Sequence, residues 1–213
     1  MLVRDCMTAN PISVNPESDP LAAIGLCKSV RIRRLPVVNA GGQVVGIVTR
    51  NMLELFLARA PSPGVMKRQY RVAEVMVSPA ITASPEYPLE EAARLMVTNK
   101  IGSLPIVEND RLVGIITETD IFKQFTEILG GQAEATRLTV EVPDTPGALA
   151  KVVNAIAALR GNLHSVVLIP CADSTALSAT LWIEDVGRDA LAAAIQNIPD
   201  VRLIRIWNKS SDR

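Results

Sequence analysis

Histidine and cysteine are scarce in this chain of 213 residues. His164 is the only histidine, and the three cysteines, Cys6, Cys27 and Cys171, lie far apart. One histidine excludes a histidine-rich metal site, and the cysteines have neither zinc-ligand spacing nor the even number of a disulfide framework. The sequence also lacks a G-x-S-x-G nucleophile motif and a Walker-type phosphate loop. We therefore expect no metal site and no catalytic residues, and a protein that is not an enzyme.

Net charge and long apolar runs are lacking too. The 22 Lys and Arg residues balance 22 Asp and Glu, so the chain has no net field that would attract a nucleic-acid backbone. No apolar run reaches the roughly 18 residues that span a bilayer, and the opening "MLVRDCMTAN" does not resemble a signal peptide. We expect a cytoplasmic protein with no nucleic-acid and no membrane partner. Its content of 48% hydrophobic and 21% charged residues is that of an ordinary globular protein.

What the chain does contain is an internal repeat in its first half. The stretch "VRDCMTANPISV" (3–14) matches "VAEVMVSPAITA" (72–83), and "RRLPVVNAGGQVVGIVTRNML" (33–53) matches "GSLPIVENDRLVGIITETDI" (102–121) with one residue deleted near the turn. A fixed period indicates a repeated structural unit. Each copy is therefore expected to form one structural unit.

Both copies predict the same order of elements. A short apolar strand, at 12–14 or 81–83, is followed by a helix, which in the second copy covers 89–99 with its apolar residues on one face. Two strands around a tight turn come next, "LPIV" and "RLVGIIT" in the second copy, and a second helix follows the threonine. A unit this small does not bury both of its faces alone, so we expect the two copies to pack on each other.

These features resemble a tandem pair of CBS domains. The resemblance rests on the element order, on "LPVV" and "LPIV", and on the Gly-x-x-Thr that ends each strand pair, and it places motif 1 at 1–67 and motif 2 at 68–131. It implies an α/β fold of two packed βαββα units that bind an adenosine-type small molecule, AMP, ADP, ATP or S-adenosylmethionine, as a regulatory ligand. No cofactor would be required. We also expect a homodimer and a partner enzyme that receives the signal.

Thr117 and Asp120 in "GIITETD" permit two interpretations. A carboxylate at the start of a helix can accept both hydroxyls of a ribose, while the threonine hydroxyl and the helix N-terminus contact a phosphate or ribose oxygen. The same Thr-x-x-Asp pattern is also close to a capping box, in which both side chains satisfy the helix's own N–H groups. Copy one retains Thr49, a possible cap, but has Met52 in place of the acid. The resemblance favours ribose binding by Asp120.

Arginines precede "LP" in copy one, where copy two has Ser103. In CBS domains a basic residue at this place often meets the ligand phosphates, so the resemblance implies this role for Arg33 and Arg34. Ser103 and Thr49 are also expected among the nucleotide-binding residues. Arginine suits forked phosphate contacts. The alternative is that Arg31 and Arg33 form the solvent face of an edge strand.

Aliphatic walls around the adenine are expected from Ile81, Thr82 and Pro105, with Ile106 beside them. Simple core packing is the alternative for these positions.

After "GG" at 130–131 the pattern changes to strand, helix, strand, strand, helix, strand, the order of the ferredoxin-like split βαβ. The residues "VPDTPGALAKV" and the later "GNL" resemble an ACT domain, an amino-acid-sensing module, which we place at 136–213. A CBS pair followed by one ACT domain resembles the family of accessory proteins of acetoin utilisation.

The ACT resemblance suggests an amino-acid site at Asp144, Gly147, Asn162 and His164. Gly147 would let a ligand or a neighbouring chain approach the backbone, and the two later residues would hold the ligand's polar end. Capping of the following helix is the alternative for Asp144, and a structural role is the alternative for His164.

Two functions follow from these observations. The first is a regulatory sensor that binds an adenine nucleotide in the CBS pair, with amino-acid sensing or dimerisation by the ACT domain. The second is a ligand-free interaction module that dimerises and docks on a partner enzyme. The acid missing at Met52 favours the second.

Overall fold

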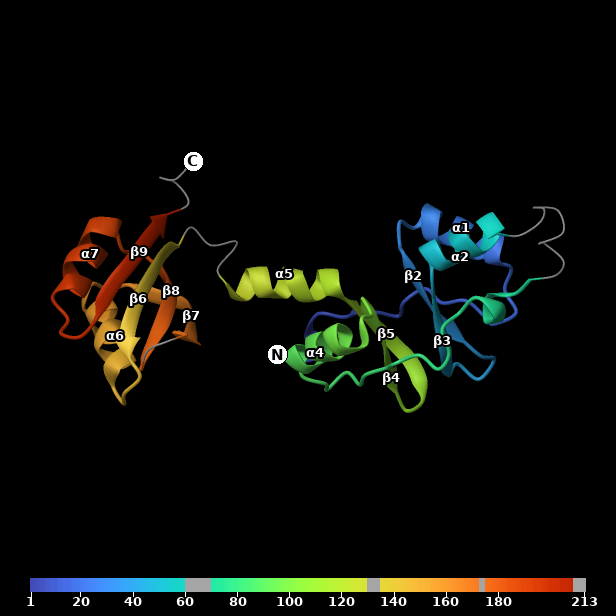
Figure 1. Ribbon diagram of the computed structural model, residues 1–213, viewed down its shortest axis with the longest axis horizontal. Coiled ribbons are helices and arrows are strands. Elements are labelled where there is room, and N and C mark those ends of the chain that lie inside the picture. The colour runs from blue at the N-terminus through green and yellow to red at the C-terminus, as the bar shows by residue number, and fades with distance from the viewer. Residues whose placement is uncertain (60–69, 130–134, 173–174, 209–213) are drawn as a thin grey trace. The chain divides into compact units, whose positions relative to one another are not determined.

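The computed structural model describes residues 1–59, 70–129, 135–172 and 175–208 of the chain. It divides into two compact units, Met1–Phe122 and Lys123–Arg213 (Figure 1). The division falls within helix α5, a few residues before the boundary expected near 131, which itself lies outside the described residues. No helix in the described part of the chain combines the length and the apolar character needed to cross a membrane.

Motif 1 is a pair of antiparallel strands covered by two helices. Its elements are α1 (Pro20–Ser29), β2 (Arg34–Val38), β3 (Val44–Thr49) and α2 (Arg50–Arg59). Helix α1 begins where the sequence predicts a start, because the Asp19 side chain accepts a hydrogen bond from the Leu21 N–H and a proline occupies the first turn. Strands β2 and β3 pair through a turn of "NAGG".

Motif 2 repeats this order. Its elements are α4 (Leu89–Asn99), β4 (Ser103–Glu108), β5 (Arg111–Thr117) and α5 (Glu118–Ile128). The bounds of α4 confirm the predicted helix, whose buried face carries Leu89, Ala92 and Met96. Strand β5 also pairs with β1 (Thr8–Ala9), a short strand from the start of the chain.

The start of each repeat, here called its lead segment (residues 1–9 in copy one and 70–78 in copy two), packs on the other motif. Val3, in the 3-10 turn η1 (Val3–Asp5), is fully buried in the core of motif 2, and Val72, in η2 (Val72–Glu74), is fully buried in the core of motif 1. In Figure 1 the N-terminus accordingly lies beside α4. The sequence repeat and the packed unit are therefore offset, because each core is completed by the lead segment of the other copy.

This exchange explains the glycine of the repeated Gly-x-x-Thr. A Cβ added at Gly114 would lie 2.4 Å from the Met7 sulfur, and one at Gly46 would lie 2.7 Å from the Met76 sulfur and 2.9 Å from the Val77 carbonyl oxygen. Each methionine belongs to the lead segment that crosses the glycine. The glycine thus keeps space for the crossing segment.

Two local expectations are wrong. The short strands expected at 12–14 and 81–83 are reduced to isolated bridges, Val14 to Val37 and Ala83 to Ile106. The alternative of an edge strand through Arg31 also fails. Val30 closes α1, Arg31 has a left-handed φ of 57°, and β2 starts only at Arg34.

The C-terminal unit has the predicted βαββαβ order. Its elements are β6 (Thr136–Pro143), α6 (Ala148–Ala158), β7 (Asn162–Pro170), β8 (Ala176–Glu184), α7 (Arg188–Gln196) and β9 (Arg202–Asn208). The sheet order is β7-β8-β6-β9, all antiparallel. Both helices and three of the strands contribute buried aliphatic residues to one core, which is the arrangement of a ferredoxin-like fold.

Candidate functional site

The start of α5 holds Thr117 and Asp120 in a capping box. The Thr117 N–H and hydroxyl donate to Asp120 Oδ2 at 2.9 and 2.7 Å, and the Asp120 N–H lies 3.4 Å from the Thr117 hydroxyl oxygen. The structure therefore contains the Thr117–Asp120 contact that the capping interpretation predicts. Both residues are half-buried, so the carboxylate is fixed in direction and still reaches the surface.

Copy one has half of this arrangement. The Thr49 hydroxyl accepts a hydrogen bond from the Met52 N–H at 3.2 Å. Met52 has no carboxylate with which to return the contact. The threonine is thus shared by the two copies as a helix cap, and the acid belongs to motif 2 alone.

Arg34 crosses from motif 1 to this end of motif 2. Its guanidinium Nη2 lies 3.6 Å from Glu118 Oε2, at the first residue of α5. A Cβ at Gly102 would lie 2.0 Å from the same nitrogen. Burial lowers the pKa of the Arg34 guanidinium, while the carboxylates of Glu118 and Asp120 oppose this shift. Arg34 and Asp120, predicted from different copies, therefore lie close enough for their charges to interact.

The other residues expected around the ligand lie along β4. Ser103 pairs with Thr117 across the sheet and is buried, as is Pro105. The Ala83 N–H donates to the Pro105 carbonyl at 3.2 Å. The preceding Ile81 and Thr82 are exposed beside this strand. Ile106 is fully buried in the core of motif 2, as the alternative of simple core packing predicts.

Arg33 and Thr49 lie in motif 1, on a pocket of about 250 Å³. Arg34 lines the same pocket, so it faces both motifs. Its six lining residues are Arg33, Arg34, Thr49, Arg50, Asn51 and Glu54.

Sequence reasoning missed three residues near these sites. Arg50 and Glu118 occupy matched positions directly after the threonine of each copy, and comparing their charges would have drawn attention to them. Cys6 gives no such signal. The pKa of its thiol is raised by burial and then by the carboxylates of Asp120 and Asp5, which places a residue of the exchanged lead segment beside Asp120.

In the C-terminal unit, Asp144 does not cap the helix that follows it. Helix α6 starts at Ala148, and its N-cap is Gly147, with a left-handed φ of 85° and no side-chain capping bond. The Asp144 N–H instead donates to the Thr175 carbonyl at 2.8 Å, which ties the loop to the start of β8. Gly147 is required by its φ rather than by a close approach within the chain, since a Cβ there would meet nothing within 4 Å.

Asn162 and His164 come together around Glu184. The Asn162 amide donates to Glu184 Oε2 at 3.4 Å, and His164 Nδ1 lies 3.8 Å from Glu184 Oε1. Asn162 pairs with Glu184 at one end of the sheet, whereas Asp144 follows β6 at the other end. The eight residues of β6 span roughly 25 Å. One copy of the chain therefore does not gather the four expected amino-acid-binding residues into one site.

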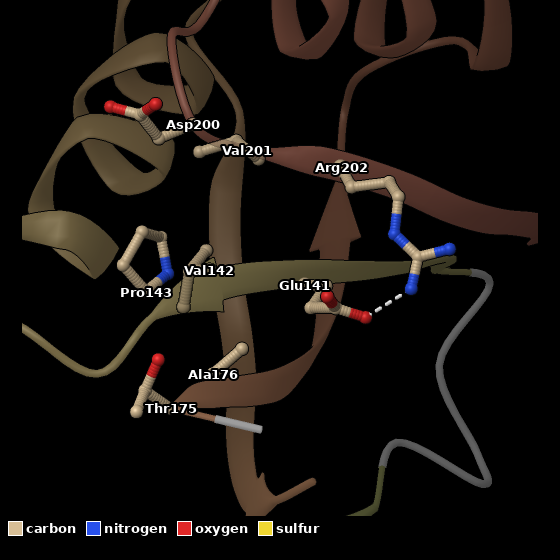
Figure 2. Close-up of a pocket in the computed structure, with 8 residues that line it drawn as sticks. All are labelled: Glu141, Val142, Pro143, Thr175, Ala176, Asp200, Val201 and Arg202. Carbon is tan, nitrogen blue, oxygen red and sulfur yellow. Dashed lines mark hydrogen bonds and ion pairs between the residues drawn. The ribbon is translucent and has the colours of Figure 1, made fainter. Parts of the chain in front are cut away.

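A pocket of about 410 Å³ lies beside the Asp144 loop (Figure 2). Its polar rim contains the Glu141–Arg202 ion pair and Asp200, and Pro143 and Thr175 line it next to the loop. Figure 2 shows Asp200 and Thr175 on opposite sides of this opening. The sequence did not predict this pocket, because its residues come from the end of β6 and from the starts of β8 and β9 with the residues just before them, and form no local motif.

The two repeated motifs exchange their lead segments, and an acid of one lies near an arginine of the other. The family model of the CBS domain matches residues 3–57 and 72–127, more than half of the chain, and the chain belongs to this family. CBS pairs are regulatory ligand-binding modules rather than catalytic ones.

Solved structures similar to this chain include complexes with adenosine compounds. The CBS domain pair of the protein MJ0100, in complex with 5′-methylthioadenosine and S-adenosyl-L-methionine, is 28% identical, with a TM-score of 0.53 over 62% of this chain and 98% of that one. CBSX2 in complex with AMP is 25% identical, with a TM-score of 0.51 over 60% and 98%. A Vibrio cholerae protein described as an acetoin utilization protein (AcuB) is 31% identical, with a TM-score of 0.54 over 62% and 95%.

Proposed function

We propose that the CBS pair binds an adenosine-type ligand, AMP, ADP, ATP or S-adenosylmethionine, at Asp120, and that this binding regulates a partner rather than driving catalysis. The observation that carries the proposal is the half-buried carboxylate of Asp120 at the start of α5, with the guanidinium of Arg34 from the other motif nearby. The acid would take the ribose hydroxyls. The arginine would take the phosphate or carboxylate end of the ligand.

Capping and ribose binding are compatible at Asp120. The capping bonds from Thr117 both go to Oδ2, whereas a carboxylate offers about four acceptor positions on its two oxygens. The cap would therefore orient the acid for the ribose rather than compete with it. Ser103, Pro105, Ile81 and Thr82 would form the surrounding wall.

Calorimetry of the full chain against AMP, ADP, ATP and S-adenosylmethionine tests this function. At about 100 times its dissociation constant, a ligand stabilises the unit that binds it by about 2.7 kcal/mol. We therefore expect at least one of the four to give both binding heat and a higher melting temperature. Absence of heat and of any thermal shift with all four would instead support the ligand-free interaction module, which the missing acid at Met52 favours.

We infer that the C-terminal unit is an ACT domain and that it acts between copies of the chain. The support is the spacing of its residues. Asp144 and Gly147 lie at one end of the sheet and Asn162 and His164 at the other, so only two copies side by side would complete an amino-acid site. Amino-acid sensing and dimerisation would then be coupled, because the amino acid would bind only where two copies of the domain meet. The likeness to the Vibrio cholerae protein makes acetoin utilisation the process that we propose is regulated, through a partner enzyme.

Analytical ultracentrifugation tests the role of this domain. We expect a dimer, and we expect a mixture of the twenty amino acids to raise the dimer fraction of a dilute sample. Gly147→Val should abolish the increase, because a β-branched residue at a φ of 85° is strained and covers the backbone there. Gly187→Val is the matched control, since Gly187 also precedes a helix but has an ordinary φ of −72°. A monomer under all conditions would contradict the proposal.

A further inference from the structure

Helix α2 and the lead segment of copy two enclose a second pocket of motif 1, which lies beside Met52. Its volume is about 430 Å³. Five of its seven lining residues are apolar or aromatic: Met52, Leu55, Phe56, Tyr70 and Val75. A largely apolar pocket of this size is typical of small-molecule sites.

The wall of this pocket is already formed in the single chain. The rings of Phe56 and Tyr70 meet edge to face, with centroids 5.1 Å apart and an interplanar angle of 87°, which is a favourable geometry for an aromatic pair. This contact joins α2 to the lead segment of copy two. Both rings are only half-buried, and Leu55 is 50% exposed, so apolar surface remains uncovered in the pocket.

The sequence of motif 2 does not repeat this apolar surface. In the order given above, the matched positions are Asp120, Lys123, Gln124, Met1 and Cys6. The three positions on α2 are apolar, whereas their counterparts on α5 carry two charges and an amide. The change from acid to methionine at position 52 therefore belongs to a larger change from a polar to an apolar helix face.

One cation and one anion complete the lining of the pocket. Arg59 ends α2, and Glu74 lies in η2, where its Oε1 accepts a hydrogen bond from the Arg71 N–H at 3.0 Å. Both side chains are exposed, and their opposite charges leave the pocket with no net charge that would select an ion. A charged ligand would lose hydration against the apolar wall, whereas an uncharged polar group finds a donor in Arg59 and an acceptor in Glu74.

We propose that this pocket binds an uncharged small molecule with an aromatic or aliphatic body, a ligand of a different class from the adenosine compound proposed for Asp120. Burial of apolar surface supplies the affinity, and Arg59 and Glu74 contact the polar group of the molecule. Turn η2 also contains Val72, which is buried in the core of motif 1, so the bound molecule stabilises the packing of the lead segment of copy two on motif 1. Met52 thus marks a change of ligand rather than the loss of a site.

NMR titration of the full chain, followed through its methionine methyl signals, tests the site. The probes are 3-phenylpropionamide, 3-phenylpropionate and 3-phenylpropylamine, which are similar in size and are uncharged, anionic and cationic. The Met52 signal is the one missing from Met52→Leu, and the signal of Met96, which is buried in the core of motif 2, is the internal control. We expect the amide to shift the Met52 signal with a dissociation constant of roughly 1 mM, and each ion to bind at least about threefold more weakly. No probe contains adenosine, so the result does not depend on binding at Asp120.

Four variants relate the binding to the pocket. Phe56→Gln introduces the residue of the matched position in motif 2 and should weaken binding of the amide about tenfold through loss of the ring. Phe125→Gln is the matched control, because Phe125 is an exposed ring on α5 outside the pocket, and it should change the affinity less than about twofold. Arg59→Gln leaves a negative lining and should strengthen binding of the cationic probe roughly threefold, and Glu74→Gln should do the same for the anionic probe.

Three outcomes would overturn the proposal. They are an unshifted Met52 signal at about 10 mM amide, equal effects of Phe56→Gln and Phe125→Gln, and tighter binding of either ion than of the amide to the unaltered chain. The melting temperature of each variant shows whether it is folded. Arg59→Gln and Glu74→Gln change exposed side chains, which costs little stability, so they test the pocket even if Phe56→Gln does not fold.

Discussion

Asp120→Asn is expected to remove the thermal and calorimetric response to adenosine ligands while leaving the fold intact. The amide oxygen of asparagine can still accept the two bonds from Thr117 that close the capping box, so the cost in stability is limited to the lost charge at a helix N-terminus, about 0.3–1 kcal/mol. Ribose binding loses more. A hydrogen bond to a charged group contributes about 1.5–3 kcal/mol, so we expect affinity to fall by roughly 10- to 150-fold.

Asp110→Asn is the matched control for this change. Asp110 is exposed in the turn between β4 and β5, with a left-handed φ of 61° that asparagine also adopts. The control removes the same charge from the same motif and should leave the ligand response unchanged. If Asp120→Asn lowers stability but leaves the affinity for every responding ligand as it was, Asp120 serves only as a cap.

The local part of the site could be predicted from the sequence because its residues are close along the chain. Thr117 and Asp120 are three residues apart, and the Thr-x-x-Asp spacing at a helix start determines their contact. The bounds of α4 follow similarly from one apolar face.

Contacts between distant segments could not be predicted in this way. The approach of Arg34 to Glu118 joins residues 84 positions apart, and it depends on how the two motifs pack. The Asp144 error has a related cause. A residue with capping chemistry lies three positions too early, and the loop is held instead by the carbonyl of Thr175, the residue just before β8.

The exchange of lead segments leads to the second large effect: Val3→Asp should unfold motif 2, although Val3 is far from it in sequence. The side chain is fully buried among the apolar residues of α4, β4 and β5. An unpaired carboxylate there costs several kcal/mol, a large share of the roughly 5–15 kcal/mol that stabilises a domain. Val3→Ala, a milder change, should cost roughly 2 kcal/mol.

Hydrogen–deuterium exchange locates the effect of Val3→Asp, because it reports each helix and strand separately. Amides of α4 and β4 should lose protection first in Val3→Asp, and amides of α1 and β2 first in Val72→Asp, since Val72 completes the core of motif 1. Ala9→Asp is the control within the same lead segment, because that side chain is exposed. Loss of protection in α1 and β2 before α4 in Val3→Asp would show that each lead segment stabilises its own copy. The two cores would then be independent, and ligand binding in one motif would have no packed route to the other.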